Sequence, residues 1–251
     1  MVLTGKVGVV TGAAGNLGLA AARLFLEQGA RVMLVDKDAS SLRAALERLE
    51  SNRASSAIAD VTRASDVEAY AAATEKAFGK IDLFFNNAGI EGKVCPLTEY
   101  PDDVFDQVMA VNVKGVYLGL KHVLPRMNDG GSVIITSSVA ARRGTPAFVA
   151  YAASKHAVVG IMQCAALEAA PRRIRINTIH PGMVESAMME RLHRQFAPAQ
   201  PAAARESFQS AIKLGRYVRP DEVAQLVLFL ASDSSTMVTG SEFVIDGGFL
   251  L

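Results

Sequence analysis

The sequence has few cysteines and no long apolar run. Its two cysteines, Cys95 and Cys164, are too few for a disulfide framework and lack the spacing of metal ligands. We therefore expect free thiols in a reducing compartment. The longest apolar stretches, such as Val7–Val10 and Val223–Leu230, are far shorter than the roughly 20 residues that span a bilayer. No charged leader with an apolar run opens the sequence, so we expect a cytoplasmic protein without a membrane partner.

An excess of one charge is also absent. The chain has 26 Lys and Arg against 25 Asp and Glu, which gives a formal net charge of +1, and neither sign forms a long run. This pattern lacks the electrostatic footprint of a protein that binds nucleic acid or an anionic membrane surface. Half of the residues are hydrophobic, as in ordinary globular proteins. We expect a single domain that spans residues 1–251.

Short apolar or β-branched runs alternate with stretches of helical periodicity. This alternation is typical of a parallel sheet with crossover helices on both faces, and the apolar strands fit burial on both sides. The predicted strands are Val7–Thr11, Arg31–Val35, Ser55–Ala59, Ile81–Phe85, Ser132–Thr136, Ile174–Ile179 and Phe243–Ile245. The predicted helices are Leu17–Gln28, Ser40–Glu50, Ala64–Phe78, Asp102–Met127, Ala150–Ala169 and Pro220–Ser232. The sequence therefore predicts a doubly wound α/β fold with about seven parallel strands.

One segment departs from this alternation. Ser186–Tyr217 is rich in Met, Gln, Ala and Pro, with Pro198 and Pro201 among them. The composition predicts a mobile excursion with short helices. Because a long irregular insertion in a compact domain is most often functional, we expect a lid at residues 186–217.

A glycine-rich turn follows the first predicted strand and leads directly into a helix. Glycines let the backbone approach a phosphate closely, and a helix N-terminus offers free N–H groups and a positive dipole end. A turn of this kind can also be simple turn chemistry, but the strand–turn–helix context favours the dinucleotide site of a Rossmann fold. The candidate pyrophosphate-binding residues are Gly12, Gly15, Asn16, Leu17 and Gly18.

An acidic residue ends the second predicted strand. Asp36, 18 residues after Gly18, is placed to accept hydrogen bonds from the adenosine ribose hydroxyls and to repel a 2′-phosphate. The glycine turn has no arginine, and Lys37 is the one basic neighbour of Asp36, so NAD is favoured over NADP. The alternative is that Asp36 caps the helix that begins near Ala39 or Ser40.

Along nearly its whole length, the chain resembles the short-chain dehydrogenase/reductase family. Tyr-x-x-x-Lys is common by chance, but a serine 13 residues before it and a glycine turn near the N-terminus make coincidence negligible. Besides that turn and Asp36, the matching motifs are Asp60-Val61, Asn86-Asn87-Ala88-Gly89, Asn112, Ser137-Ser138, Tyr151-Ala152-Ala153-Ser154-Lys155, Pro181-Gly182 and Asp246-Gly247-Gly248.

The chain departs from the family pattern at one position. Thr-Gly-x-x-x-Gly-x-Gly requires glycine at position 16, where Asn16 stands beside Gly15. Asparagine tolerates left-handed backbone angles better than other non-glycine residues, so we expect an intact but slightly altered turn.

The resemblance also implies a cofactor site. It places Asp60 and Val61 at the adenine, Asn87 at the adenosine-side ribose and the backbone around Val184 at the nicotinamide amide. The expected cofactor-binding residues beyond the glycine turn and Asp36 are Asp60, Val61, Asn87, Tyr151, Lys155, Pro181, Gly182 and Val184.

Tyr151 and Lys155 lie one turn apart on the same helix face. A phenol has a pKa near 10, so lowering it to neutral pH takes roughly 4 kcal/mol of preferential stabilisation of the phenolate, which a nearby ammonium and oxidised nicotinamide can supply. We expect Tyr151 to be the general acid/base for a secondary alcohol or ketone, with Lys155 also bonding the nicotinamide ribose. Ser138 would hold the reacting oxygen. By resemblance, Asn112 would kink its helix and hold a water that links Lys155 to solvent.

Other polar and apolar residues are weaker candidates. The histidines lack metal-ligand spacing and triad context, so we expect no metal site and ordinary structural roles for His122, His156, His180 and His193. Five apolar residues fit two roles about equally well, either lining an apolar pocket or packing in the core: Met183, Met188, Met189, Leu192 and Phe196. Further candidates for substrate contact are Arg142, Arg143, Glu91 and Glu185.

Two other functions stay open at this point. A 3-oxoacyl-thioester reductase, or another carbonyl reductase, shares these motifs, although Asp36 argues against the NADP common there. A non-catalytic NAD-binding protein has no need of Tyr151. The sequence does not identify the small-molecule substrate. The resemblance implies a homotetramer, with Asp102–Met127 and Ala150–Ala169 at one interface and Gly248–Leu251 near another.

Overall fold

The fold is built around one parallel sheet. The computed structural model describes residues 1–251 and has seven strands in the order β3-β2-β1-β4-β5-β6-β7. All neighbouring strands pair in parallel. The strands are β1 (Val7–Thr11), β2 (Arg31–Asp36), β3 (Ala54–Ile58), β4 (Ile81–Asn86), β5 (Met127–Thr136), β6 (Arg175–Pro181) and β7 (Glu242–Ile245). The predicted doubly wound fold is confirmed.

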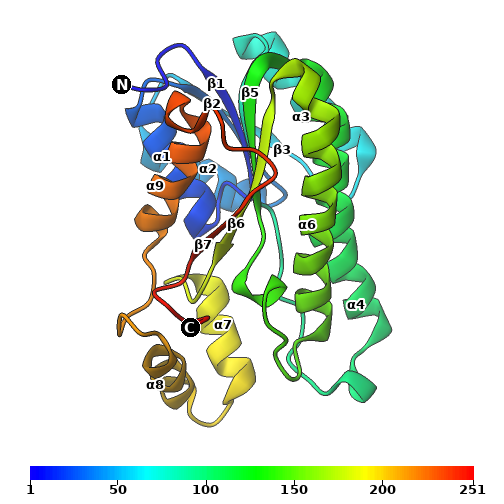
Figure 1. Cartoon of the computed structure of the whole chain (residues 1–251), viewed down its shortest axis with the longest axis vertical. Coiled ribbons are helices and arrows are strands. Elements are labelled where there is room, and N and C mark those ends of the chain that lie inside the picture. Colours follow the sequence, from blue (N-terminus) through cyan, green and yellow to red (C-terminus); the bar gives the residue numbers. More distant parts are fainter.

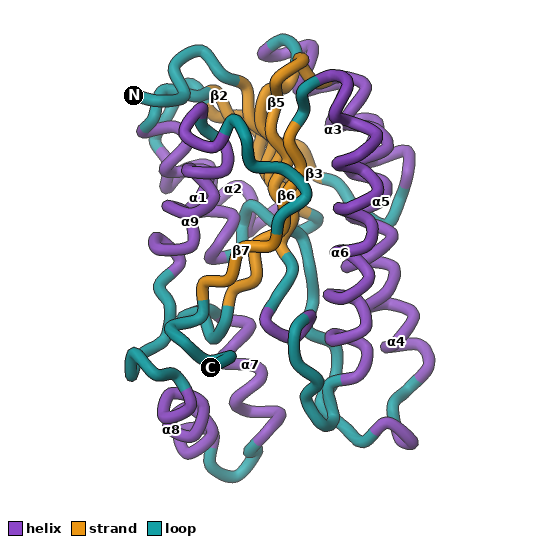
Figure 2. The backbone as a smooth tube through the Cα atoms, in the orientation of Figure 1, coloured by secondary structure: helices purple, strands orange, loops and turns teal.

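Helices cover both faces of this sheet (Figures 1 and 2). One face carries α1, α2 and α9, and the other carries α3, α5 and α6. The helices are α1 (Asn16–Glu27), α2 (Ala39–Leu49), α3 (Ala64–Phe78), α4 (Asp102–Met109), α5 (Gly115–Val123), α6 (Val149–Ala169), α7 (Ala187–Phe196), α8 (Pro201–Ala211) and α9 (Pro220–Ala231).

Two hydrophobic cores follow from the alternation of side chains along the strands. Val10 and Phe85 belong to the core under α1 and α9, whereas Val9 and Phe84 belong to the core under α3, α5 and α6. Successive residues of a strand point to opposite faces, so a strand between two helix layers must be apolar at every position. This requirement explains why the strands were recognisable as short continuous apolar runs.

The predicted helix Asp102–Met127 is wrong as a single element. A π-helical turn at Ala110–Lys114 separates α4 from α5, and β5 already begins at Met127. Asn112 lies in this turn and is fully buried. The predicted strand Ser132–Thr136 begins five residues too late, because Met127 already pairs with Ile81 before an irregularity in the register.

Residues 186–217 form two short helices, as predicted. Both α7 and α8 lie beyond the end of the sheet, in the lower part of Figure 1 near the C-terminus. The ends of the segment meet, because a parallel bridge joins Val184 to Val218. The excursion therefore leaves and rejoins the fold at one place.

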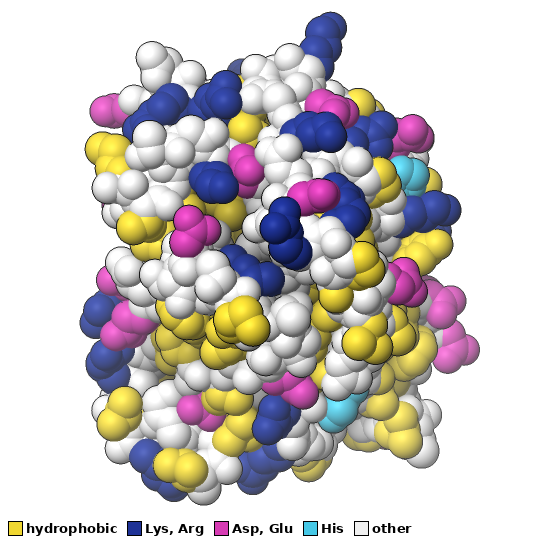
Figure 3. All heavy atoms as spheres, turned by 45° about the horizontal axis from the view of Figure 1, so that its top comes forward, with side chains coloured by type: hydrophobic (Ala, Val, Ile, Leu, Met, Phe, Trp, Pro, Cys, Tyr) yellow, Lys and Arg dark blue, Asp and Glu magenta, His cyan; other side chains and the backbone are white.

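The surface carries charges of both signs. On the face shown in Figure 3, Lys and Arg side chains alternate with Asp and Glu, without a large area of one sign. None of the helices is long and apolar enough to cross a membrane.

Candidate active site

A large cavity lies at the carboxyl edge of the sheet. Its volume is about 600 Å³, and it is lined by the segments that follow β1, β2, β4, β5 and β6 together with α7 and α8. In doubly wound sheets a ligand crevice opens where the strand order reverses, which here is between β1 and β4. Of the residues predicted to be catalytic or to bind the cofactor, Gly18 and Asn112 do not line this cavity and all the others do, whereas the further candidates Arg142, Glu91 and Glu185 do not line it.

The glycine turn between β1 and α1 needs glycine for two different reasons. Gly12 has φ +63°, in the left-handed region, and a Cβ there would lie 3.0 Å from the Ala88 Cα. A Cβ at Gly18 would overlap the Gly12 carbonyl oxygen and lie 2.8 Å from the Ala13 Cα. The turn therefore brings its backbone close to the loop after β4 and to its own helix.

Asn16 does not use the left-handed conformation that we expected. It is the first residue of α1, and the non-glycine residues with positive φ are Glu50, Ala147 and Arg173. Its carboxamide instead reaches α7, where Asn16 Oδ1 accepts a hydrogen bond of 3.2 Å from Ala187 N. An asparagine thus fits because position 16 is helical, and its side chain connects the turn to the 186–217 segment.

Asp36 lies at the end of β2 and faces the cavity. Its Oδ2 accepts a hydrogen bond of 3.1 Å from Ala14 N in the glycine turn. The alternative role as a helix cap is wrong, because Asp38 caps α2 by accepting a hydrogen bond of 2.7 Å from Ser41 N.

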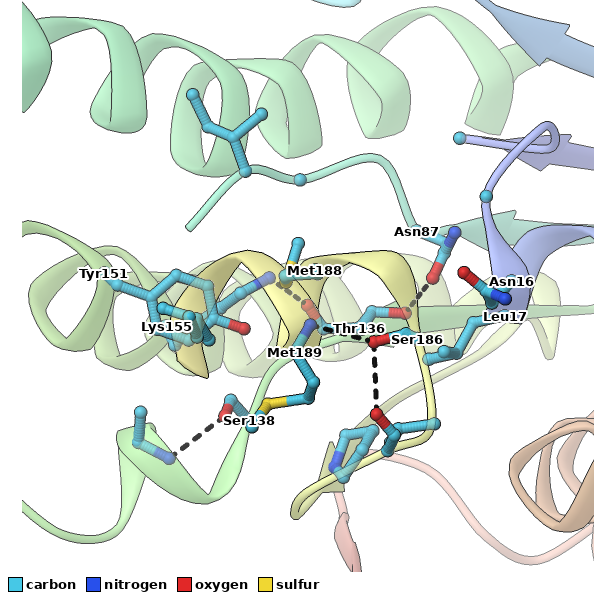
Figure 4. A pocket seen from close by; sticks show the side chains of 18 of the residues that line it. Asn16, Leu17, Asn87, Thr136, Ser138, Tyr151, Lys155, Ser186, Met188 and Met189 are labelled. Carbon is cyan, nitrogen blue, oxygen red and sulfur yellow. Dashed lines mark hydrogen bonds between the residues drawn. The ribbon is translucent and has the colours of Figure 1, made fainter. Parts of the chain in front are cut away.

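Hydrogen bonds join the ends of the three central strands. Thr11 Oγ1, at the end of β1, accepts from Asn87 N at 2.9 Å and from Ala88 N at 3.1 Å. The Asn87 carboxamide donates to Thr11 O at 3.0 Å and accepts from Thr136 Oγ1 at 2.9 Å. These bonds hold Asn87 and Thr136 in place where they line the cavity, and Figure 4 shows the bond between these two side chains.

Tyr151, Lys155 and Ser138 lie together in the same part of the cavity (Figure 4). Lys155 Nζ is 5.5 Å from the centroid of the Tyr151 ring and donates a hydrogen bond of 2.8 Å to Thr136 O. Ser138 follows β5, and its Oγ accepts from Ala140 N at 3.1 Å. The structure thus brings together the three side chains that the sequence singled out.

Burial shifts the pKa values of both ionisable groups. Tyr151 is partly open to the cavity, but the protein surrounds it densely, and this burial raises its pKa to about 12. The hydrogen bond with the Ser138 hydroxyl lowers the pKa, and the negative charge of Glu91 raises it further. Burial lowers the pKa of the Lys155 ammonium to about 8. At neutral pH the protein alone therefore holds a neutral phenol beside a charged ammonium.

Asn112 acts behind the cavity. From the π-helical turn, its Oδ1 accepts from Ile90 N at 2.8 Å, and its Nδ2 donates to Ile90 O at 2.9 Å and to Ser154 Oγ at 3.0 Å. It thereby connects the loop after β4 to α6, the helix that carries Tyr151 and Lys155.

One histidine has closer ties to the site than the sequence indicated. His180, on β6, is fully buried, and its Nδ1 forms a hydrogen bond of 3.0 Å with Ser138 O. Its Nε2 lies 2.9 Å from Thr178 Oγ1 and 3.4 Å from the Glu242 carboxylate. A histidine directly before Pro181-Gly182 gives no local signal of this contact, because Ser138 lies on another strand end.

The candidate charged residues are mostly paired with other protein groups. Glu91 is buried and forms a bidentate ion pair with Arg191 on α7, a residue that the sequence did not single out. The other pairs are Arg142–Glu242 and Arg205–Glu185. Arg143 has no such carboxylate partner and lines the cavity with its guanidinium 5.6 Å from the Phe249 ring centroid.

The predicted apolar pocket residues all line the cavity, namely Met183, Met188, Met189, Leu192 and Phe196. Phe148 and Phe208 also line it, although their surroundings in the sequence gave no indication of this role. No group of three or more His, Cys, Asp or Glu side chains is placed to hold a metal ion.

Comparison with known proteins agrees with this geometry. A sequence model of the family described as enoyl-(acyl carrier protein) reductase matches residues 12–250. The chain is 40% identical to levodione reductase of Leifsonia aquatica, over 98% of this chain and 94% of that protein. The chain belongs to the short-chain dehydrogenase/reductase family. As a member of this family, it is an oxidoreductase that uses a nicotinamide cofactor.

Other members of the short-chain dehydrogenase/reductase family are similar over the full chain. The 3-oxoacyl-[acyl-carrier-protein] reductase of Thermotoga maritima is 37% identical and covers 100% of both chains. The crystal structure of levodione reductase has a TM-score of 0.95 and covers 98% of both chains. That of NAD⁺-bound xylitol dehydrogenase has a TM-score of 0.94 at 34% identity, covering 98% of this chain and 99% of the other.

The residues of this short-chain dehydrogenase/reductase fit a dinucleotide. Gly12 and Gly18 have no side chain, and a Cβ at either position would clash with the surrounding backbone. The backbone of the turn is therefore exposed for contact with a pyrophosphate next to the N-terminus of α1. Asp36 presents its carboxylate to the same cavity at the end of β2.

Gly18→Ala is expected to lower the free energy of unfolding by about 1–3 kcal/mol and to weaken NADH binding, because the new methyl group overpacks the turn. Urea unfolding and NADH fluorescence titration measure the two effects. The control is Gly144→Ala, where a Cβ meets nothing within 4 Å and φ is not positive, so little change is expected in either measurement. Equal stability and NADH affinity in the two variants would contradict this assignment.

Proposed function

We propose that the enzyme interconverts a secondary alcohol and the matching ketone, with NAD as its nicotinamide cofactor. The observation that carries this proposal is the grouping of Ser138, Tyr151 and Lys155 in the cavity that also holds the glycine turn and Asp36. Two similar proteins, named levodione reductase and xylitol dehydrogenase, support it, since their names imply carbonyl or hydroxyl groups on carbon.

The chain's residues handle the proton in this reaction. The Ser138 hydroxyl holds the reacting oxygen, and Tyr151 takes the hydroxyl proton as the carbon loses a hydride and the C–O bond becomes a carbonyl. In the reverse direction, Tyr151 returns its proton to the oxygen. Bound nicotinamide supplies the hydride acceptor or donor.

Lys155 adjusts the acidity of Tyr151. With its own pKa lowered only to about 8, it remains charged at neutral pH, and a positive charge beside the phenol favours the phenolate. With Lys155 already beside it, Tyr151 keeps a pKa of about 12 in the protein alone and is protonated at neutral pH. Proton acceptance in alcohol oxidation therefore also needs the positive charge of oxidised nicotinamide.

Asp36 supports NAD over NADP. Its carboxylate faces the cavity at the end of β2, and it would repel a 2′-phosphate on a bound adenosine ribose, since two like charges about 4 Å apart repel by about 4 kcal/mol near a protein surface. A 3-oxoacyl-thioester reductase is the second candidate function, favoured by the full-length similarity to the Thermotoga maritima enzyme. The segment 186–217 would be the lid in either case.

We also propose that the enzyme is a homotetramer. The supporting observation is a mostly apolar groove between α4, the π-helical turn, α5 and α6, lined by Met109, Ala110, Val113, Lys114, Tyr117 and Ile161. Tyr117 is 50% exposed and Leu167, farther along α6, is 79% exposed. Association of chains through this face would bury both side chains.

Tyr151→Phe is expected to lower the rate of alcohol oxidation by about 10²–10⁴-fold while NADH affinity stays unchanged, because phenylalanine keeps the ring and loses the proton-carrying hydroxyl. Absorbance at 340 nm measures turnover, and fluorescence titration measures binding. The control is Tyr70→Phe in α3, whose hydroxyl has no hydrogen-bond partner and which does not line the cavity. Near-normal turnover by Tyr151→Phe would refute the role of Tyr151.

In Lys155→Met, the pH profile of the residual alcohol oxidation is expected to move to higher pH than in the wild type. The phenolate of Tyr151 loses its neighbouring positive charge, so the pKa of the phenol rises.

Asp36→Asn is expected to lower the ratio of kcat/KM for NAD to that for NADP at least about tenfold, equivalent to 1.4 kcal/mol. The variant keeps an oxygen that can accept from Ala14 N but loses the negative charge. Asp38→Asn, an exposed position where asparagine caps α2 equally well, is the matched control. An unchanged ratio would show that another group selects the cofactor.

Light scattering of the purified enzyme is expected to give the mass of four 26.6 kDa chains. Tyr117→Asp should reduce this mass, because a charge in the apolar groove opposes burial, whereas Met237→Asp at a 95% exposed position should not. A wild-type monomer would contradict the proposed assembly.

A further inference from the structure

We infer that the substrate is an uncharged, mainly apolar alcohol or ketone that carries a ring or a bulky hydrocarbon group next to the reacting carbon. The inference rests on the proposed function, because it takes Ser138 and Tyr151 to mark the position of the reacting oxygen. It goes further by assigning the rest of the cavity to one class of substrate.

Aromatic rings form a continuous wall that begins at Tyr151. The Phe148 ring stacks on Tyr151 with centroids 4.7 Å apart and an interplanar angle of 27°. Phe196 of α7 lies 6.2 Å from Phe148, and Phe208 of α8 meets Phe196 edge-on at 5.2 Å. All four residues line the cavity. A substrate held at Tyr151 thus has aromatic surface beside its reacting carbon.

Flexible apolar side chains complete this end of the cavity. Met188, Met189 and Leu192 come from α7, and Figure 4 shows both methionines in the same part of the cavity as Ser138 and Tyr151. Methionine adapts its shape to an apolar partner. Burial of apolar substrate surface against such a wall contributes about 25 cal/mol per Å².

Charged groups at this end are neutralised or lie at the rim. Arg191 lines the cavity, but both of its terminal contacts go to Glu91. Arg143 is exposed and lies over the ring of Phe249, near the C-terminus. A substrate anion deep in the cavity would therefore have no free cation beside it apart from Lys155, whose Nζ bonds Thr136 O.

Few hydroxyl partners are present for a polyol. Ser186, at the start of α7, already bonds Val184 O and Met189 N. Beyond Ser138 and Tyr151, the remaining hydroxyls that line this end belong to Thr145 and Ser207. Each substrate hydroxyl buried without a partner costs about 1–3 kcal/mol. The cavity therefore disfavours substrates that carry a hydroxyl on every carbon, although one similar structure is named as a xylitol dehydrogenase.

The test compares three alcohols with NAD and the wild-type enzyme: 1-phenylethanol, 2-propanol and xylitol. We expect kcat/KM for 1-phenylethanol to exceed that for xylitol at least about 30-fold, since two unpartnered hydroxyls cost at least about 2 kcal/mol. The corresponding ketone, acetophenone, should be reduced with NADH. A kcat/KM for xylitol equal to or above that for 1-phenylethanol would overturn the inference.

Two variants tie the preference to the aromatic wall. Phe208→Ala should lower kcat/KM for 1-phenylethanol about tenfold more than for 2-propanol, with NAD affinity unchanged, because the larger substrate loses a wall that the smaller one does not reach. Phe229→Ala is the control, since Phe229, on α9, packs on Phe243 of β7 and does not line the cavity. Equal losses for both alcohols in Phe208→Ala would refute the role of this wall.

The experiment separates the two levels of the proposal. Tyr151-dependent turnover that favours xylitol would leave the proposed function intact and overturn the substrate class. Absence of turnover for all the alcohols and for acetophenone, in an enzyme that binds NADH, would overturn both. Turnover of a 3-oxoacyl thioester in their place would support the second candidate function and refute the proposed class of apolar alcohols and ketones.

Discussion

The parallel pairing of β1 with β4 is the interaction on which the rest of the site depends. β1 has β2 on one side and β4 on the other, so the connections after β1 and β4 leave the sheet in opposite directions and open a crevice between them. Thr11 and Asn87 hold this boundary together, and Gly12 lets the two loops approach closely. The polar groups needed for chemistry then lie at strand ends, where the core no longer surrounds them.

The features that could be predicted from the sequence are those set by local pattern. A strand buried on both faces is a run of apolar residues, and a turn at its end is marked by glycine, so the seven strands and the residues after β1, β2 and β5 could be placed. Tyr151 and Lys155 share a face because α6 is regular between them. Residues whose position depends on one element alone were therefore the easiest to identify.

What the sequence missed depends on contacts between distant segments. Glu91 and Arg191 are 100 residues apart, and nothing near either one indicates the other. His180 meets Ser138 through neighbouring strand ends. The break between α4 and α5 was expected only through the family resemblance, which places a kink at Asn112, because it depends on hydrogen bonds of Asn112 to another loop and another helix that helical periodicity cannot indicate. Asn16 was misjudged because helix α1 begins one residue earlier than expected.

The bridge between Val184 and Val218 has a consequence for how this fold diversifies. Because the two ends of the 186–217 excursion already meet, its length and composition can change at little cost in chain entropy, which rises only slowly with loop length. The segment 186–217 can therefore vary independently of the rest of the fold. Its two helices supply much of the surface that contacts the substrate, while the end of β5 and helix α6 supply the reactive groups. Recognition and reactivity can then evolve on separate parts of one chain.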